Sequence, residues 1–137
     1  MVEIIVDGKD IVLGRLGSYV AKELLKGNSV TVINSEEVVM SGNKNQIVEK
    51  INKKRRMGQG GSLKGPIYIR QSDRLLKRMI RGMLPWDRTK GREAYKRLRC
   101  YIGSSDISEE DLLKVKTLNF KRPLRVVTMK EIVRALK

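Results

Sequence analysis

Short unbroken apolar runs alternate along this chain with longer segments in which apolar residues recur at helical spacing. The short runs, at residues 4–6, 30–33, 38–40 and 100–102, are typical of strands buried on both faces of a sheet. The longer segments predict helices at residues 13–24, 44–56, 74–84, 92–98 and 128–136. Strands that alternate with helices indicate an α/β fold, with a mainly parallel four-stranded sheet and helices on both of its faces. No repeat or linker interrupts the pattern, so residues 1–137 are predicted to form a single domain.

The segment 74–84 has the most sharply divided pattern. Its apolar residues fall within one half of a helix circumference, and they are Leu75, Leu76, Met79, Ile80, Met83 and Leu84. The other half carries Arg74, Lys77, Arg78 and Arg81. Pro85 is expected to stop this helix, and Ser72 or Asp73 to cap its beginning. One face of the helix therefore belongs to the core, and the other is a row of cations.

Three further sequence signals concern helix ends and packing. Asn43 with Gln46, and Thr128 with Glu131, have the spacing of capping boxes. Gly17, in the segment 14–17, is predicted to allow close packing of a helix against the sheet. A glycine turn that opens a helix can also hold a nucleotide phosphate, but this segment lacks the full spacing of a dinucleotide-binding fingerprint.

Charge is the second strong signal. The 137 residues include 30 Lys and Arg against 15 Asp and Glu, a formal net charge of +15. Such an excess opposes compaction unless a polyanion neutralises it. Acids are scarce between residues 73 and 103, and the basic pattern continues past Pro85. The candidate RNA-binding residues are Lys53, Lys54, Arg55, Arg56, Arg70, Arg74, Lys77, Arg78, Arg81, Arg88, Lys90, Arg92, Arg97 and Arg99.

The composition excludes several kinds of chemistry. The chain has no His and a single Cys, so a zinc finger or zinc ribbon is excluded and the commonest general base is missing. Cys100 is interpreted as a small core residue, and no cofactor or metal is expected. No apolar run is long enough to cross a bilayer, and the amino terminus does not resemble a signal peptide, which predicts an intracellular protein without a membrane partner.

The kind of nucleic acid follows from the few aromatic residues. They do not suggest a paired stacking platform, so contact with the phosphates and shape of a folded RNA is favoured. The glycine-rich segment 57–65 is expected to order on RNA. Acids between residues 106 and 111 are interpreted as a solvated loop or helix start. The alternatives are an RNA-processing or nucleotide-using enzyme on an α/β sheet, and a protein that compacts DNA.

One set of motifs resembles a known family. The segments 80–85 (IRGMLP), 91–92 (GR) and 98–103 (LRCYIG) are similar to the signature of the ribosomal protein L13 family, in its archaeal and eukaryotic branch. The resemblance implies a three-layer α/β/α domain with a four-stranded sheet. It also implies a structural, non-catalytic component of the large ribosomal subunit that binds 23S-type rRNA beside neighbouring ribosomal proteins. The expected location is the cytoplasmic ribosome, and no small-molecule substrate is expected.

Overall fold

The computed structural model describes residues 1–58, 67, 69–104 and 107–136. Strands and helices alternate along most of this length, as the hydrophobic pattern predicts. In chain order the elements are β1 (Glu3–Asp7), α1 (Leu13–Leu25), β2 (Ser29–Ile33), the 3-10 helix η1 (Ser35–Glu37), β3 (Val39–Ser41), α2 (Lys44–Arg56), α3 (Ser72–Arg81), α4 (Thr89–Lys96), β4 (Leu98–Cys100), α5 (Glu109–Leu112), β5 (Val126–Thr128) and α6 (Met129–Ala135).

The main sheet has β2 at its centre, with β1 and β4 parallel to it on either side. Val30 pairs with Ile4 on one side and Leu98 on the other, so these side chains share one face of the sheet. The residues of β2 that follow Ser29 are all buried, as expected for a central parallel strand. The α/β class, with a mainly parallel sheet flanked by helices, is confirmed.

The predicted count of four strands in that sheet is wrong for the described residues. β3 pairs antiparallel with β5, Met40 opposite Val127, and an isolated bridge joins its Val39 to Val12. β2 already has a hydrogen-bonded strand on each side, so a fourth strand could join only at the outer edge of β1 or β4, and the outer edge of β1 carries an isolated bridge to Lys116. Asn34, in the left-handed conformation with φ 52°, also turns the chain away from the end of β2. Two further elements are shifted: β4 is Leu98–Cys100 rather than residues 100–102, and α4 is Thr89–Lys96 rather than residues 92–98.

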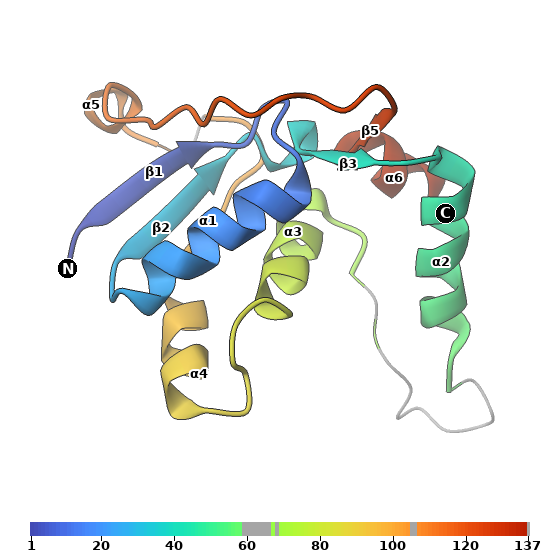
Figure 1. Cartoon of the computed structure of the whole chain (residues 1–137), viewed down its shortest axis with the longest axis horizontal. Helices are drawn as coiled ribbons and strands as arrows, with labels where there is room; N and C mark the ends of the chain where they lie inside the picture. The colour runs from blue at the N-terminus through green and yellow to red at the C-terminus, as the bar shows by residue number, and fades with distance from the viewer. Residues whose placement is uncertain (59–66, 68, 105–106, 137) are drawn as a thin grey trace.

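The core lies between the sheet and the helices α1, α3 and α4. Figure 1 shows α1 across the strands, with α3 and α4 below them, and the chain between α5 and β5 along the top of the molecule. The largest fully buried side chains of α1, α3 and the sheet are Leu16, Val20 and Leu24 of α1, Leu75, Leu76 and Ile80 of α3, and Val6, Val30 and Leu98 of the sheet. Of the apolar half of the predicted helix 74–84, Leu75, Leu76, Ile80 and Leu84 therefore form core and Met79 packs against it, whereas Met83 is 39% exposed.

The beginning and end of α3 differ from the prediction. Gln71 is the N-cap residue and makes no side-chain cap hydrogen bond, and the proposed caps Ser72 and Asp73 lie inside the helix. The helix starts early because the Gln71 carbonyl accepts the Leu75 amide at 2.8 Å. It ends at Arg81, and a further turn of hydrogen bonds carries the chain to the buried Leu84. Pro85 thus follows a helix that has already ended.

Two other local predictions can be compared with the structure. The Thr128 hydroxyl accepts the Glu131 amide at 3.3 Å, so the predicted cap of α6 is confirmed. Asn43 caps α2, but its side chain accepts from Asn45 at 3.0 Å, and the structure shows no bond from Gln46 among the described residues. No helix in the described residues has the length and apolar character needed to cross a membrane.

The prediction for Gly17 placed the wrong element against it. A Cβ built on Gly17 would lie 2.5 Å from the Met83 sulfur, and the next neighbour is Ile80. The glycine therefore lets the end of α3 pack against α1, rather than α1 against the sheet. This contact holds in place the turn that carries Met83 out of α3.

Candidate nucleic-acid interface

Half of the predicted RNA-binding residues gather on α3, α4 and the turn between them. Arg74 and Arg78 are exposed on α3, and Lys77 and Arg81 are half-buried on the same helix. The turn and the first part of α4 add further exposed cations. We call this set the α3–α4 surface, and its members are Arg74, Lys77, Arg78, Arg81, Arg88, Lys90 and Arg92.

An aromatic pair positions the two half-buried cations of this surface. The rings of Trp86 and Tyr95 meet edge to face, with centroids 5.2 Å apart and planes at 89°. The Arg81 guanidinium lies 3.9 Å from the centre of the Trp86 ring, and the Lys77 amine lies 5.1 Å from that of Tyr95. Cation–π contacts of this kind hold a charged group without neutralising it. Burial raises the pKa of Tyr95, and the nearby positive charge of Arg81 opposes that rise.

Sequence reasoning missed this pair, because it treated the aromatic residues as separate. The sequence holds only a weak signal for the pairing of Trp86 with Tyr95. Lys77 and Arg81 stand one helical turn apart on the cationic face of α3, and the Pro85 turn reverses the chain so that the rings meet. Only the conformation of the turn shows that Trp86 and Tyr95 come together.

The turn between α3 and α4 is fixed by Arg92 and Gly91. Arg92 donates from Nε to the Trp86 carbonyl at 3.1 Å and from Nη2 to the Asp87 carbonyl at 3.3 Å, yet it stays exposed. Gly91 is buried, and a Cβ there would lie 2.5 Å from the Pro85 carbonyl carbon and closer still to its oxygen. A glycine is thus needed where α4 touches the proline.

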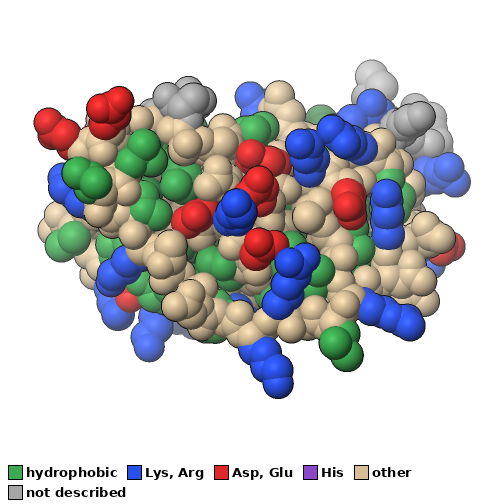
Figure 2. Space-filling view, turned by 90° about the horizontal axis from the view of Figure 1, so that it is seen from above, with side chains coloured by type: hydrophobic (Ala, Val, Ile, Leu, Met, Phe, Trp, Pro, Cys, Tyr) green, Lys and Arg blue, Asp and Glu red, His purple; other side chains and the backbone are tan. Residues whose placement is uncertain are grey.

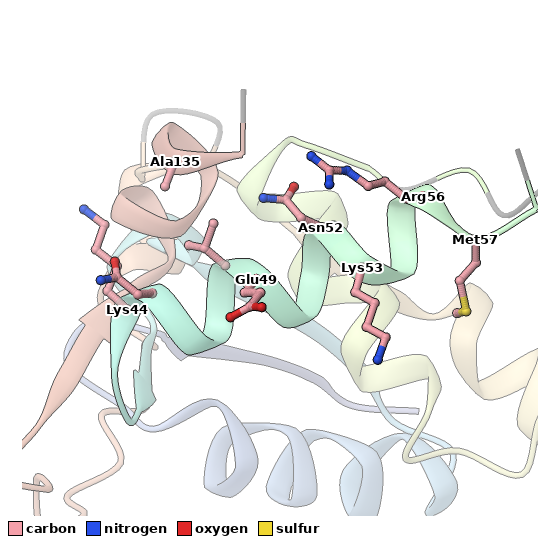
Figure 3. A pocket seen from close by; sticks show the side chains of 9 residues that line it. Lys44, Glu49, Asn52, Lys53, Arg56, Met57 and Ala135 are labelled. Carbon is pink, nitrogen blue, oxygen red and sulfur yellow. The ribbon is translucent and has the colours of Figure 1, made fainter.

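A second group of predicted residues lies at the end of α2. Lys53, Lys54 and Arg56 are exposed, while Arg55 is half-buried and donates to the Leu136 carbonyl at 3.5 Å. Figure 3 shows Lys53 and Arg56 projecting from α2 beside a groove of about 570 Å³. In Figure 1, α2 stands at the right end of the molecule and α4 at the lower left, with α3 between them, so this group is separate from the α3–α4 surface.

The remaining three candidates, Arg70, Arg99 and Arg97, occupy different surroundings. Arg70 is exposed just before α3, and Arg99 borders a cavity of about 250 Å³ together with Asp73, Arg74 and Lys77. Arg97 instead turns inward. Its Nη2 donates to the Leu24 carbonyl at 2.8 Å, and its Nε is buried without a hydrogen-bond partner. Arg97 therefore fastens the end of α1 to the start of β4.

The cations of the α3–α4 surface have no acidic partners among the described residues. The ion pairs that the structure describes join Lys26 to Glu23, Lys114 to Asp111 and Arg122 to Asp10, at 2.6, 3.3 and 3.2 Å. Asp73, Asp87 and Glu93 lie on the same elements but form no ion pair among the described residues. On the face that Figure 2 views from above, several acidic side chains lie near the middle, among scattered basic ones. The ion pairs among the described residues therefore leave the cations of the α3–α4 surface without a carboxylate at salt-bridge distance.

The alternative chemistries find little support in the geometry. Within the part of the chain that the structure describes, no group of His, Cys, Asp and Glu side chains could hold a metal ion. Burial raises the pKa of the Cys100 thiol to about 12, which leaves it protonated and a poor nucleophile. Gly14 is exposed, and its backbone does not adopt a positive φ.

The fold and this surface together define an α/β domain that presents preorganised, unneutralised cations. Comparison with known proteins is more specific. A family model described as ribosomal protein L13 matches residues 2–106. The chain belongs to the ribosomal protein L13 family, as the signature motifs predict, and so to the ribosomal proteins rather than to the enzymes.

The similar proteins include three from archaea, each named large ribosomal subunit protein uL13. The Methanopyrus kandleri protein is 47% identical over 106 residues, which are 77% of this chain and 65% of that protein. The Haloarcula marismortui protein is 37% identical over 134 residues, 98% of this chain and 90% of that protein. The Natronomonas pharaonis protein is 35% identical over 130 residues, 95% and 88% of the two chains. The match thus spans slightly less than two thirds of the first relative and most of the other two.

Proposed function

We propose that the chain is a structural component of the large ribosomal subunit, in the cytoplasm, that binds folded 23S-type rRNA and supports assembly of the subunit. Family membership and the names of the relatives support the assignment. The observation that carries it is the α3–α4 surface, whose cations are held over rings or exposed and have no acidic partner among the described residues. Neighbouring ribosomal proteins are the other expected partners.

The proposed mechanism is contact with phosphates by cations already in position. Each phosphate that a Lys or Arg neutralises releases condensed counterions, which favours binding and makes it depend on salt. Lys77 and Arg81 are held by the aromatic pair, so they lose less side-chain freedom on binding than free surface cations would. The surface therefore reads the shape and charge of the RNA rather than its bases.

The other predicted residues take different places in this proposal. Lys53, Lys54 and Arg56 form a second contact region at the end of α2. Arg97 is assigned a structural role, since its guanidinium contacts the Leu24 carbonyl. The predicted ordering of the glycine-rich segment 57–65 falls on residues of which 59–65 lie outside the described ones. That expectation stays a prediction.

A charge-matched pair of variants tests the proposal. Arg74→Gln with Arg78→Gln removes two exposed cations from the α3–α4 surface, and Lys130→Gln with Arg134→Gln removes two exposed cations from α6. Binding to large-subunit rRNA fragments is measured over a range of salt concentrations. The first variant should reduce the slope of log K against log salt by roughly 1.5, because two phosphate contacts are lost.

The control should leave that slope nearly unchanged, although its net charge falls equally. Equal effects of both variants would show that overall charge, not this surface, binds the RNA. Binding that does not respond to salt would overturn the proposal as a whole. Co-sedimentation of the wild-type protein with large subunits in high salt tests the assembly role separately.

A further inference from the structure

The basic segment between α5 and β5 contacts α1 through Arg15, and a bridge between Lys116 and Val6 and an ion pair between Arg122 and Asp10 also fasten it to the fold. Residues 113–125 run along the top of the molecule in Figure 1 and pass the beginning of α1. There Arg15 donates from Nη1 to the Lys121 carbonyl at 3.0 Å, and its guanidinium lies 5.7 Å from the centre of the Phe120 ring. This contact joins positions 106 residues apart in the chain and places an aromatic ring beside the exposed side of α1.

The ring forms one wall of an open pocket on α1. The pocket has a volume of about 610 Å³, and we call it the α1 pocket; its lining residues are Val12, Gly14, Arg15, Ser18, Tyr19, Lys22 and Phe120. No acidic side chain is among these lining residues. Gly14 leaves room for an occupant, since nothing lies within 4 Å of where its Cβ would be. The Ser18 hydroxyl donates to the Gly14 carbonyl at 2.8 Å, so the hydroxyl oxygen remains able to accept a hydrogen bond.

Phe120 differs from the aromatic residues of the α3–α4 surface. Trp86 and Tyr95 contact each other, and each has a cation over its ring. Phe120 also has a cation near its ring, the Arg15 guanidinium at 5.7 Å, but no aromatic ring among the described residues contacts it, and it is 42% exposed and borders the pocket. Phe120 is an apolar ring with cations close by and no acid among the lining residues of the pocket. Such a site binds a lone phosphate poorly, but it suits a flat ring that belongs to a polyanion. Unpaired bases of RNA stack on aromatic side chains and on arginine planes while nearby cations meet their phosphates.

We propose that the α1 pocket takes an unpaired nucleobase of an RNA strand, stacked against Phe120. Arg15 and Lys22 meet the phosphates on either side of that base. The inference rests on the proposed function and deepens it. The α3–α4 surface contacts the backbone of folded RNA, and the α1 pocket selects a place where a base is extruded. A peptide is the less suited occupant. A nucleotide offers both a planar base for the apolar lining and phosphates for the cations that flank it.

The test compares an RNA that has bases with one that lacks them. The probes are hexa-adenylate and an abasic ribose-phosphate oligomer of the same length, each labelled for fluorescence anisotropy. The wild-type protein should bind hexa-adenylate about tenfold more tightly, the effect expected from stacking one base. Phe120→Leu keeps an apolar side chain but lacks a flat ring, so it should remove that difference. Phe120→Tyr keeps the ring and should restore it.

Several outcomes would overturn the inference. Equal affinity of the wild-type protein for the two probes would do so, as would an undiminished preference for hexa-adenylate in Phe120→Leu. A third outcome concerns reconstituted large subunits. A photoreactive residue at position 120 that crosslinks to a protein rather than to RNA would show that the α1 pocket has a different occupant. Binding of the abasic probe should be the same in all variants, because the phosphate contacts are untouched.

Failure of this inference is distinguishable from failure of the proposed function. If rRNA fragments still bind with a steep salt dependence that Arg74→Gln with Arg78→Gln weakens, only the α1 pocket assignment falls. If the salt-dependent binding of rRNA is itself missing, the proposed function falls, whatever the two short probes do.

Discussion

Substitution of Gly91 by alanine tests whether the turn before α4 is as tightly packed as the structure indicates. Gly91 is buried near the start of the helix, and an added Cβ would lie 2.5 Å from the Pro85 carbonyl carbon and 3.1 Å from the proline Cγ. The Pro85 carbonyl accepts the Arg88 amide at 3.1 Å, so it belongs to the turn and cannot rotate away without breaking that bond. The substitution therefore forces one backbone segment away from another.

The expected magnitude comes from two opposing effects. Alanine favours a helix over glycine by about 1 kcal/mol. Adding atoms to a filled space costs about 1 to 3 kcal/mol, and a clash with backbone belongs at or above the upper end of that range. We expect Gly91→Ala to lower the free energy of unfolding by about 2 kcal/mol. For a chain of this length, that corresponds to a fall in Tm of roughly 5 to 10 °C.

The assay is urea denaturation followed by the fluorescence of Trp86, the single tryptophan, with circular dichroism as a second probe. Gly17→Ala is the matched control, because it has the same gain in helix propensity but a softer obstacle. Its Cβ would meet the sulfur and terminal methyl of Met83 at 2.5 and 2.8 Å, and that flexible side chain is 39% exposed and can move. Gly17→Ala should change stability by less than about 1 kcal/mol. A Gly91→Ala protein as stable as the wild type would refute the packing argument.

Three further predictions concern residues outside the α3–α4 surface. Arg97→Ala should lower the free energy of unfolding by about 1 to 3 kcal/mol in urea denaturation, because the part-buried bond to the Leu24 carbonyl is lost. Cys100, whose pKa burial raises to about 12, should react with an aromatic disulfide reagent at least about tenfold more slowly at about pH 8 in the folded than in the unfolded protein. The Lys26 amine, which donates to Glu23 at 2.6 Å, holds the pKa of that carboxyl below 4.5. Its contribution to stability is present above pH 4.5 and is lost as the pH falls through the lowered pKa, so Glu23→Gln should flatten the acid side of a plot of Tm against pH.

The hydrophobic pattern predicted well where burial is one-sided or complete. Leu75, Leu76 and Ile80 of α3 are at most 1% exposed, and they are the residues whose spacing defined the apolar face. The unbroken apolar run of β2 likewise became the buried central strand. In both cases the spacing of the apolar residues matches the set of side chains that folding buries away from water.

The pattern could not predict which elements would pair. The apolar run at 38–40 looks like that of β2, but β3 pairs with β5, which lies far along the chain. Local chemistry also left choices open at the start of α3, where Ser72 and Asp73 are both good caps and neither acts as one. These outcomes depend on long-range packing, for which a single sequence carries no periodic signal.

The candidate interface could likewise be predicted only in part. Exposure on α3 follows from spacing, but contacts with distant residues do not. Spacing placed Arg74 and Arg78 on the outer face of α3, where they are exposed. Arg97 is also among the predicted RNA-binding residues, but its guanidinium contacts the Leu24 carbonyl, which comes from another helix and which spacing could not predict. The pairing of Trp86 with Tyr95 was missed for the same reason, since it depends on the shape of the turn.

The α3 helix also shows how the fold tolerates the charge that its surface presents. Arg74 with Arg78, and Lys77 with Arg81, are like-charge pairs one turn apart, each of which costs about 0.2 to 0.5 kcal/mol. Full burial of a leucine or isoleucine contributes about 1.5 to 3 kcal/mol, and α3 buries Leu75, Leu76 and Ile80. The apolar face therefore keeps the helix formed in spite of the repulsion. A bound polyanion would relieve that repulsion, so binding of RNA and stability of the fold should increase together.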